Sequence, residues 1–156
     1  MSDTFFTAAP DWTWWIIFYF FIGGIAGTAF FLASMLRLSG GTSPLVRLGY
    51  YLAFIGALVS GFLLTVDLDR PLRFWHMLIQ NHTGLPMFKP FVPMSVGSWG
   101  LLLFGLFAFL ATLASLSEER QDVRLLQWGP IRFLRRRGPM FAIAILGSIF
   151  GLFIAG

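Results

Sequence analysis

The sequence predicts an all-α integral membrane protein with four transmembrane helices and a short interfacial amphipathic helix between the second and the third. Of its 156 residues, 57% are hydrophobic and 12% are charged, about half the charged share of a typical soluble domain. Four stretches contain no Asp, Glu, Lys or Arg. Each is long enough to cross a hydrocarbon core of about 30 Å as a helix; they are Trp12–Leu36, Leu48–Val66, Pro90–Ser117 and Gly138–Gly156. Residues 1–156 are therefore predicted to form a single transmembrane domain.

The first span is predicted over about 13–36 and the second over about 48–67. The first opens on an aromatic girdle, which tryptophans commonly form at a membrane interface. It ends at Arg37, before a Gly40-Gly41 turn. The second span is stopped by Pro71, because proline lacks the amide hydrogen that a helix interior requires. The girdle consists of Trp12, Trp14 and Trp15.

The third and fourth spans are predicted over about 98–116 and 139–155. The third begins near Ser98-Trp99, after a connection that contains several prolines. A polar loop is expected from Glu118 to Arg137, before the fourth span. The first Lys or Arg of the chain is Arg37, so the amino terminus lacks the positive region of a cleaved signal peptide. The first span is expected to remain in the mature protein.

The connection from Asp69 to Gly97 is predicted to contain the interfacial helix. Pro71 is suited to the first turn of a helix, where its fixed backbone angle is compatible with helical geometry. Residues at spacings of three and four would then separate into a polar and an apolar face, which is typical of a helix lying flat on a membrane surface. The polar face carries Arg73, His76 and Gln80, and the apolar face carries Leu72, Trp75, Leu78 and Ile79.

The distribution of basic residues predicts the orientation, because short cytoplasmic loops are enriched in Lys and Arg. The first and third loops are far more basic than the amino tail and the second loop. The termini and the Asp69–Gly97 connection are therefore expected outside, in the periplasm of a diderm bacterium, with the chain in the inner (cytoplasmic) membrane. The basic residues of the first and third loops are Arg37, Arg47, Arg120, Arg124, Arg132, Arg135, Arg136 and Arg137, against Arg70, Arg73 and Lys89 elsewhere.

Composition also disfavours several classes of function. Four spans leave no room for a soluble enzyme domain or a nucleic-acid-binding module, and the net charge of +4 reflects loop arginines. The absence of cysteine excludes iron–sulfur clusters and covalently attached haem from this chain. Both histidines, His76 and His82, lie in the connection, so an intrinsic haem is disfavoured. No charged residue lies near the middle of a span, which disfavours a channel or an ion-coupled transporter.

Small and hydroxyl residues within the spans suggest how the helices pack. Small residues four apart allow close approach of two helix backbones in a membrane; the pairs are Gly23 and Gly27, Gly147 and Gly151, and Gly56 and Ser60. The mid-membrane hydroxyls are expected to bond to the backbone of their own helix. They belong to Tyr19, Thr28, Ser60, Thr112 and Ser148.

Two hypotheses remain open for the ionisable groups in and before the connection. In the first, Arg70 and Arg73 anchor lipid phosphates, Asp69 caps the surface helix and His76 is an ordinary interfacial residue. In the second, these groups and Asp67 line a pocket that a lipophilic molecule enters from the membrane. Histidine would suit proton exchange there, because its unperturbed pKa is about 6.5.

Three ordered segments carry distinctive motifs. Residues 19–30 are Tyr-Phe-Phe-Ile-Gly-Gly-Ile-Ala-Gly-Thr-Ala-Phe, residues 67–75 are Asp-Leu-Asp-Arg-Pro-Leu-Arg-Phe-Trp, and residues 94–99 are Met-Ser-Val-Gly-Ser-Trp. These segments resemble the NrfD/PsrC family, the membrane subunits of polysulfide, nitrite and related reductases. The first is similar to the glycine-rich opening of that family, and the second to its Asp-Leu-Gly-Arg-Pro-x-Arg-Phe-Trp segment, with Asp69 in place of glycine. The third resembles its Met-Ser-x-Gly-(Ser/Ala)-Trp segment. Family members generally have eight or more spans, so the likeness covers only the amino-terminal half.

The resemblance implies a quinone or quinol site, for menaquinone or ubiquinone, at the outer face. It implies electron transfer between that quinone and an iron–sulfur, ferredoxin-like subunit, and onward to a catalytic subunit bearing molybdopterin or haem. This chain would bind no haem or iron–sulfur cluster itself. A further membrane subunit or a second copy is expected to complete it within the lipid bilayer. A purely structural membrane anchor of a redox complex is the alternative.

On the same resemblance, two side chains are candidates for proton exchange with the quinone and four for holding it. Asp67 and His76 are the expected proton-exchanging, catalytic residues. The candidate quinone-binding residues are Arg70, Arg73, Trp75 and Trp99. The arginines would hold the pocket or stabilise negative charge that develops on the bound ligand.

Overall fold

The computed structural model describes residues 14–41, 43–67, 93–119, 129–134 and 136–155. These residues form five α-helices, of which four are long and apolar enough to cross a membrane. The long helices are α1 (Trp14–Leu38), α2 (Pro44–Asp67), α3 (Pro93–Glu119) and α5 (Arg137–Ala155), and the short one is α4 (Gly129–Leu134). The predicted all-α fold with four transmembrane helices is confirmed. The interfacial helix that we predicted between the second and third spans lies outside the described residues.

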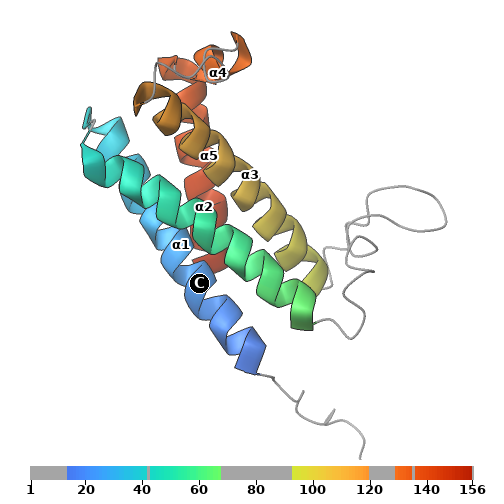
Figure 1. Cartoon of the computed structure of the whole chain (residues 1–156). Coiled ribbons are helices and arrows are strands. Elements are labelled where there is room, and N and C mark those ends of the chain that lie inside the picture. The colour runs from blue at the N-terminus through green and yellow to red at the C-terminus, as the bar shows by residue number, and fades with distance from the viewer. Residues whose placement is uncertain (1–13, 42, 68–92, 120–128, 135, 156) are drawn as a thin grey trace, which may run out of the picture.

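The four long helices pack side by side as a closed ring in which consecutive helices run in opposite directions (Figure 1). α1 packs on α2 and α5, and α3 packs on the same two helices from the other side. The centre of the ring contains large aromatic side chains, with Phe30, Tyr50 and Phe104 fully buried. Phe30 lies 5.2 Å from Tyr50 and 5.7 Å from Phe104 between ring centroids, so aromatic contacts join α1, α2 and α3.

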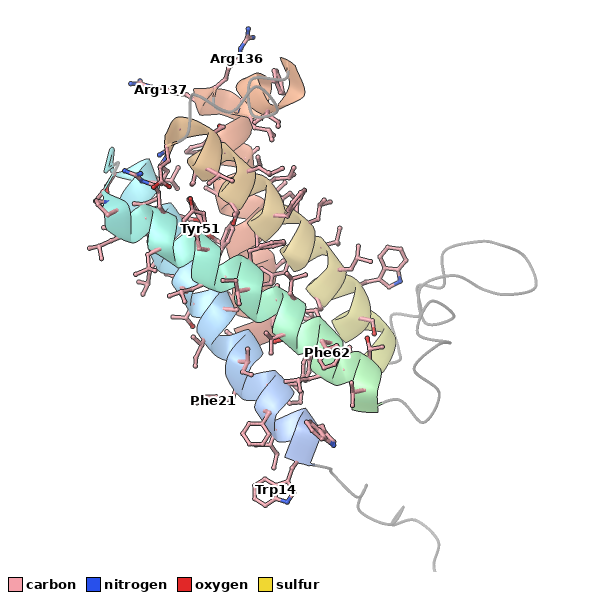
Figure 2. The ribbon with its side chains drawn as sticks, in the orientation of Figure 1. Trp14, Phe21, Tyr51, Phe62, Arg136 and Arg137 are labelled. Carbon is pink, nitrogen blue, oxygen red and sulfur yellow. The ribbon has the colours of Figure 1, made fainter. Side chains whose placement is uncertain are left out.

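Two ends of the bundle can be distinguished by their side chains (Figure 2). The arginine end, where α1 ends and α5 begins, carries Arg37, Arg47, Arg136 and Arg137, of which Figure 2 labels the last two. The tryptophan end, where α1 begins and α2 ends, carries Trp14, Trp15 and Trp99, of which Figure 2 labels Trp14. Between the two ends, large apolar side chains such as Phe21 and Phe62 point outward and are two-thirds exposed, as expected of a lipid-facing surface.

Two helices begin at prolines, several residues before the predicted starts of their spans. α2 begins at Pro44 and α3 at Pro93, whereas we predicted starts near 48 and 98. Proline in the first turn of a helix removes a hydrogen-bond donor that has no partner there in any case. The predicted starts lie later because Arg47 is counted there as a loop residue and because the third span is expected only after the prolines that precede Ser98.

The third connection contains α4, which corrects our expectation of a polar loop from Glu118 to Arg137. α4 begins at a Gly129-Pro130 pair, another proline in a first turn. Its last residue, Leu134, packs against the buried core. An apolar anchor and a favourable start therefore stabilise one turn of helix at the arginine end.

The predicted glycine turn after the first span is confirmed. Gly40 has φ of +90°, a backbone angle that residues with a side chain rarely adopt. The amide of Gly41 donates to the carbonyl of Leu36 at 3.0 Å, and the amide of Gly40 donates to that of Arg37 at 3.1 Å. These bonds satisfy carbonyls that the end of α1 would otherwise leave free, and they turn the chain directly into α2.

The small-residue pairs lie at helix contacts, as predicted. A side chain at Gly27 would overlap the backbone of Gly151, and one at Gly56 would overlap the side chain of Ala26. α1 therefore approaches α5 through its own Gly27, and α2 approaches α1 through Gly56, which faces Ala26. Close backbone contact of this kind supplies much of the packing energy of membrane helices, where lipid removes the hydrophobic drive for association.

Candidate functional site

Two of the six predicted site residues lie in described helices, and both are at the tryptophan end. Asp67 is the last residue of α2, and Trp99 lies in the second turn of α3, where its side chain is half-buried. Because α2 packs against α3, the structure brings these two positions to the same end of adjacent helices. The other four, Arg70, Arg73, Trp75 and His76, belong to the segment that connects those helix ends and lie outside the described residues.

The position of this end relative to a membrane follows from its aromatic side chains. Trp14 and Trp15 begin α1 and are exposed, and Figure 2 shows Trp14 at the tip of the bundle. Tryptophan favours the boundary between hydrocarbon and water. Asp67 ends α2 at the same end of the ring. The end of α2, which carries Asp67, therefore belongs to an interface and not to the hydrocarbon core.

At the arginine end, Arg37 and Glu118 form a two-bond ion pair. Both terminal nitrogens of Arg37 donate to the two carboxylate oxygens of Glu118, with 2.9 Å between Nη1 and Oε2. The side chains are 15% and 26% exposed. The pair joins α1 to α3, helices on opposite sides of the ring. Two-bond arginine–carboxylate contacts fix geometry as well as supplying energy.

A second carboxylate next to the first joins α2 to α3. The hydroxyl of Tyr51 donates to Glu119 at 3.1 Å, and Nη1 of Arg47 lies 3.8 Å from the same carboxylate oxygen. These side chains are more exposed than those of the first pair. Two glutamates at the end of α3 therefore bind two different helices, Glu118 the opposite α1 and Glu119 the adjacent α2.

Hydroxyl groups of the four long helices behave in three ways. Thr28 and Ser148 donate to carbonyls four residues earlier in their own helices, at 2.8 and 2.6 Å, as predicted. Thr112 does not: it donates to the carbonyl of Tyr50 on α2 at 3.0 Å, because its side chain faces that helix. Ser60 is fully buried, and its hydroxyl has no hydrogen-bond partner among the described residues.

The ion pairs at the arginine end were not predicted from the sequence, where Arg37, Arg47 and Glu118 serve only as markers of loop charge and span boundaries. A pairing signal was present, because Arg37 follows the first span and Glu118 follows the third. Alternating helix directions place those two positions at the same end of any four-span bundle.

Comparison with known proteins identifies the family. A family model described as polysulphide reductase, NrfD, matches residues 5–155. A selenate reductase subunit from Mesobacillus selenatarsenatis is 24% identical over 112 residues, which are 70% of this chain and 24% of that protein. The match thus spans about a quarter of the length of that relative. No solved structure matches the chain significantly.

Proposed function

The chain belongs to the NrfD family, and from that premise we propose that it is a quinone- or quinol-interacting membrane subunit of a respiratory reductase complex. The family match over nearly the whole chain is the observation that carries this proposal. The name of the relative supports it, since that protein is a subunit of a selenate reductase. Four helices that are suited to crossing a membrane are consistent with an anchoring role as well.

The geometry of the tryptophan end supports a site there. Asp67 ends α2, Trp99 lies near the start of the adjacent α3, and the segment between these helices carries Arg70, Arg73 and His76. A membrane quinone has a polar ring on an apolar tail. A site at the interface accommodates both parts, because the tail stays in hydrocarbon while the ring meets titratable groups beside water.

Each proposed residue has a distinct role at this site. The carboxylate of Asp67 and the imidazole of His76 accept protons when quinol is oxidised and donate them when quinone is reduced. Arg70 and Arg73 orient the ligand oxygens through their N–H groups. The indoles of Trp75 and Trp99 pack against the ring and exclude water from it. Quinone chemistry supplies the exchange of two electrons and two protons.

The partners follow from where the electrons must go. The chain has no cysteine, so it offers no ligands for an iron–sulfur cluster. An iron–sulfur, ferredoxin-like subunit docked at the tryptophan end would accept or supply the electrons and exchange them with a catalytic subunit bearing molybdopterin or haem. We place the chain in the inner membrane with the tryptophan end outside, so that protons and electrons both remain on that side. A second membrane chain or a second copy completes the subunit.

The second candidate is a purely structural anchor of a redox complex. The observation that favours it is the coverage of the relative, about a quarter of its length. A complete quinone pocket would then require helices beyond the matched part. The two candidates make different predictions. Only the first predicts that quinone copurifies with the complex and that substitution of Asp67 or His76 reduces quinone-linked turnover.

The test compares His76→Ala and Asp67→Asn with the unchanged complex. Each should reduce quinone-linked turnover by about 10²–10⁴-fold, the usual contribution of a group that transfers a proton, while the amount of assembled complex stays the same. His82→Ala is the matched control for the histidine, and Glu119→Gln removes a carboxylate at the opposite end. Both controls should retain turnover. Unchanged turnover in His76→Ala and Asp67→Asn, with no quinone in the purified complex, would favour the structural anchor.

A further inference from the structure

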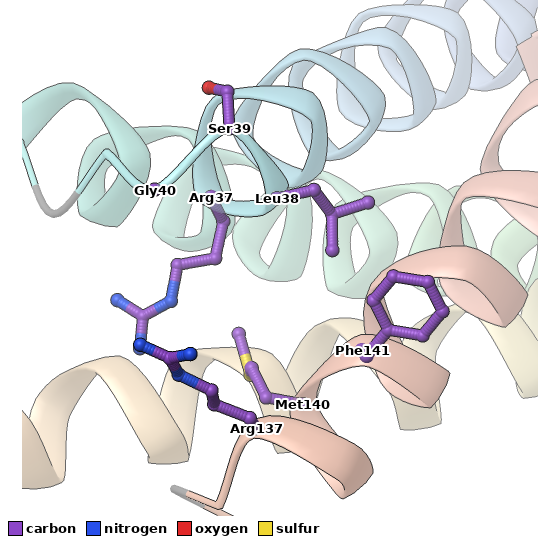
Figure 3. Close-up of a pocket in the computed structure, with 7 residues that line it drawn as sticks. All are labelled: Arg37, Leu38, Ser39, Gly40, Arg137, Met140 and Phe141. Atoms are coloured by element: carbon purple, nitrogen blue, oxygen red, sulfur yellow. The ribbon is translucent and has the colours of Figure 1, made fainter.

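A cavity of about 380 Å³ opens at the arginine end, between the end of α1 and the start of α5 (Figure 3). It lies at the end of the bundle opposite the proposed quinone site. Its lining combines two guanidinium groups, one hydroxyl and three apolar side chains. The residues that line it are Arg37, Leu38, Ser39, Gly40, Arg137, Met140 and Phe141.

The charge of this cavity is not balanced by the described residues. Glu118 pairs with Arg37, and Glu119 lies beside Arg47 on the α2 side. Among the residues that the structure describes, no carboxylate lies within ion-pair distance of Arg137. One arginine of the cavity is therefore neutralised and held in place, while the other has no acidic partner within the described part of the chain.

The rest of the cavity indicates what kind of anion would enter. Leu38, Met140 and Phe141 give it an apolar side, and Leu38 and Phe141 are themselves exposed on the lipid-facing surface of the bundle. A small soluble anion gains nothing from such a surface. A molecule with an anionic head and hydrocarbon chains satisfies the arginines and the apolar side chains together.

The position of the cavity along the helices is also suited to an anionic lipid. The stretch of α1 that is suited to crossing a membrane ends at Leu38, and that of α5 begins at Arg137. In a membrane crossed by these stretches, the two guanidinium groups fall at the level of the lipid headgroups. In addition, Arg137 is the first residue of the 19-residue helix α5 and lines the cavity, and the start of a helix favours negative charge.

We infer that this cavity binds the phosphate group of an anionic phospholipid, with Arg137 as the main contact and the acyl chains lying along Leu38 and Phe141. Arginine is suited to this role because its planar group of N–H donors matches the oxygens of a phosphate. Arg37 contributes as a second, positioned donor that Glu118 fixes in place. The inference is independent of the proposed quinone site, because none of its residues belongs to that site.

Arg136 provides a matched control. It is adjacent in the sequence and carries the same charge, but it does not line the cavity, and its guanidinium lies over the ring of Phe133 at 5.8 Å. Arg136→Gln and Arg137→Gln change the net charge equally at nearly the same depth. A diffuse attraction of anionic lipid to a basic surface would be weakened equally by both changes.

The experiment is native mass spectrometry of the purified protein, with any subunits that accompany it, titrated with phosphatidylglycerol or phosphatidylcholine. Arg137→Gln should weaken retention of phosphatidylglycerol about tenfold or more, the effect of losing one hydrogen bond to a charged group, whereas Arg136→Gln should change it little. Arg137→Lys should recover part of the binding. A melting curve in detergent should show that all three variants remain folded.

Three results would overturn the inference. They are equal loss of phosphatidylglycerol in Arg136→Gln and Arg137→Gln, equal retention of phosphatidylcholine, and binding that inorganic phosphate abolishes at millimolar concentration. The last result would identify a free phosphate anion as the ligand, with no part for the apolar side of the cavity. Turnover with quinone is not needed for any of these measurements, so failure here leaves the proposed quinone function untouched.

Discussion

Arg37 and Glu118 illustrate how a charged pair can stabilise a membrane bundle. Their side chains are largely withdrawn from solvent, so removing both charges from water costs free energy. The two parallel hydrogen bonds offset that cost only while both partners are present. Loss of one partner leaves a single charge in a poorly hydrated position, which is more destabilising than the loss of the whole pair.

Arg37→Gln should therefore lower the free energy of unfolding by about 2–3 kcal/mol, less than for a fully buried pair because both side chains retain some exposure. The double variant Arg37→Gln with Glu118→Gln should recover part of that loss. Thermal unfolding in mild detergent, followed by the change in helical circular dichroism, measures both effects.

Arg47→Gln is the control for this ion pair. Arg47 lies 3.8 Å from Glu119, and the two side chains are 32% and 45% exposed. Its replacement should cost about 0–1 kcal/mol, as is usual for exposed pairs. If Arg47→Gln destabilised the bundle as much as Arg37→Gln, the less exposed Arg37–Glu118 pair would contribute no more to stability than the exposed one, contrary to the prediction.

At the scale of the helices, the contact between α1 and α5 depends on the absence of side chains. A Cβ atom at Gly27 would meet the backbone of Gly151, which cannot move aside as a flexible side chain can. One at Gly24, a single turn earlier in α1, would meet only a carbonyl oxygen at 4.0 Å. The two glycines share a helix and a sequence motif but differ in their surroundings.

Gly27→Ala should destabilise the bundle by about 1–3 kcal/mol, because the two helices must separate to admit a methyl group. Gly24→Ala should be neutral or stabilising by up to about 1 kcal/mol, since alanine is the better helix former. Unfolding of the two variants in detergent gives the comparison. Equal effects at both positions would mean that α1 and α5 do not approach as closely as the structure shows.

The four long helices could be predicted from the sequence, whereas the contacts between them could be predicted only in part. Long stretches without charge predict membrane spans because every uncompensated charge in hydrocarbon is costly. The helix starts at Pro44 and Pro93 were not predicted. A stretch without charge shows which residues can cross the membrane, but a helix can begin several residues before that stretch. Thr112 was misassigned because sequence alone does not show which helix a hydroxyl faces.

At the scale of the molecule, the arrangement of helices places both arginine-bearing connections at one end. α1 ends and α3 ends there, as the Arg37–Glu118 pair shows, and α4 lies at that end too. The structure fixes which segments share an end. The side of the membrane that each end faces is still a prediction, and it depends on the uneven distribution of basic residues.

Single cysteines at Gln127 and Asn81 test this orientation, and the chain has no cysteine of its own to interfere. An impermeant thiol reagent on intact cells should label position 81 and spare position 127. After the cells are opened, both should react, which controls for accessibility. Preferential labelling of position 127 in intact cells would reverse the orientation and move the proposed quinone site to the cytoplasmic side.

The candidate site was predicted from motif resemblance far more than from physics. Residue properties alone left open whether Arg70, Arg73 and His76 anchor lipid or line a pocket, because both uses require the same charges at an interface. The structure adds that Asp67 and Trp99 lie at the same end of adjacent helices. The cavity beside Arg137 was not predicted, since it arises where the ends of α1 and α5 meet, far apart in the chain.

The contact between Gly27 and Gly151 also has a consequence for biosynthesis. About 120 residues separate the two glycines, and a ribosome adds about 5–20 residues per second. α1 can pair with α2 almost as soon as both have left the ribosome, but its glycine face must wait roughly 6–25 s for α5. During that interval the surface of α1 that α5 covers in the finished bundle stays exposed to the lipid and to the insertion machinery. Ring closure is therefore a late event, and in a chain halted before α5 that surface stays uncovered.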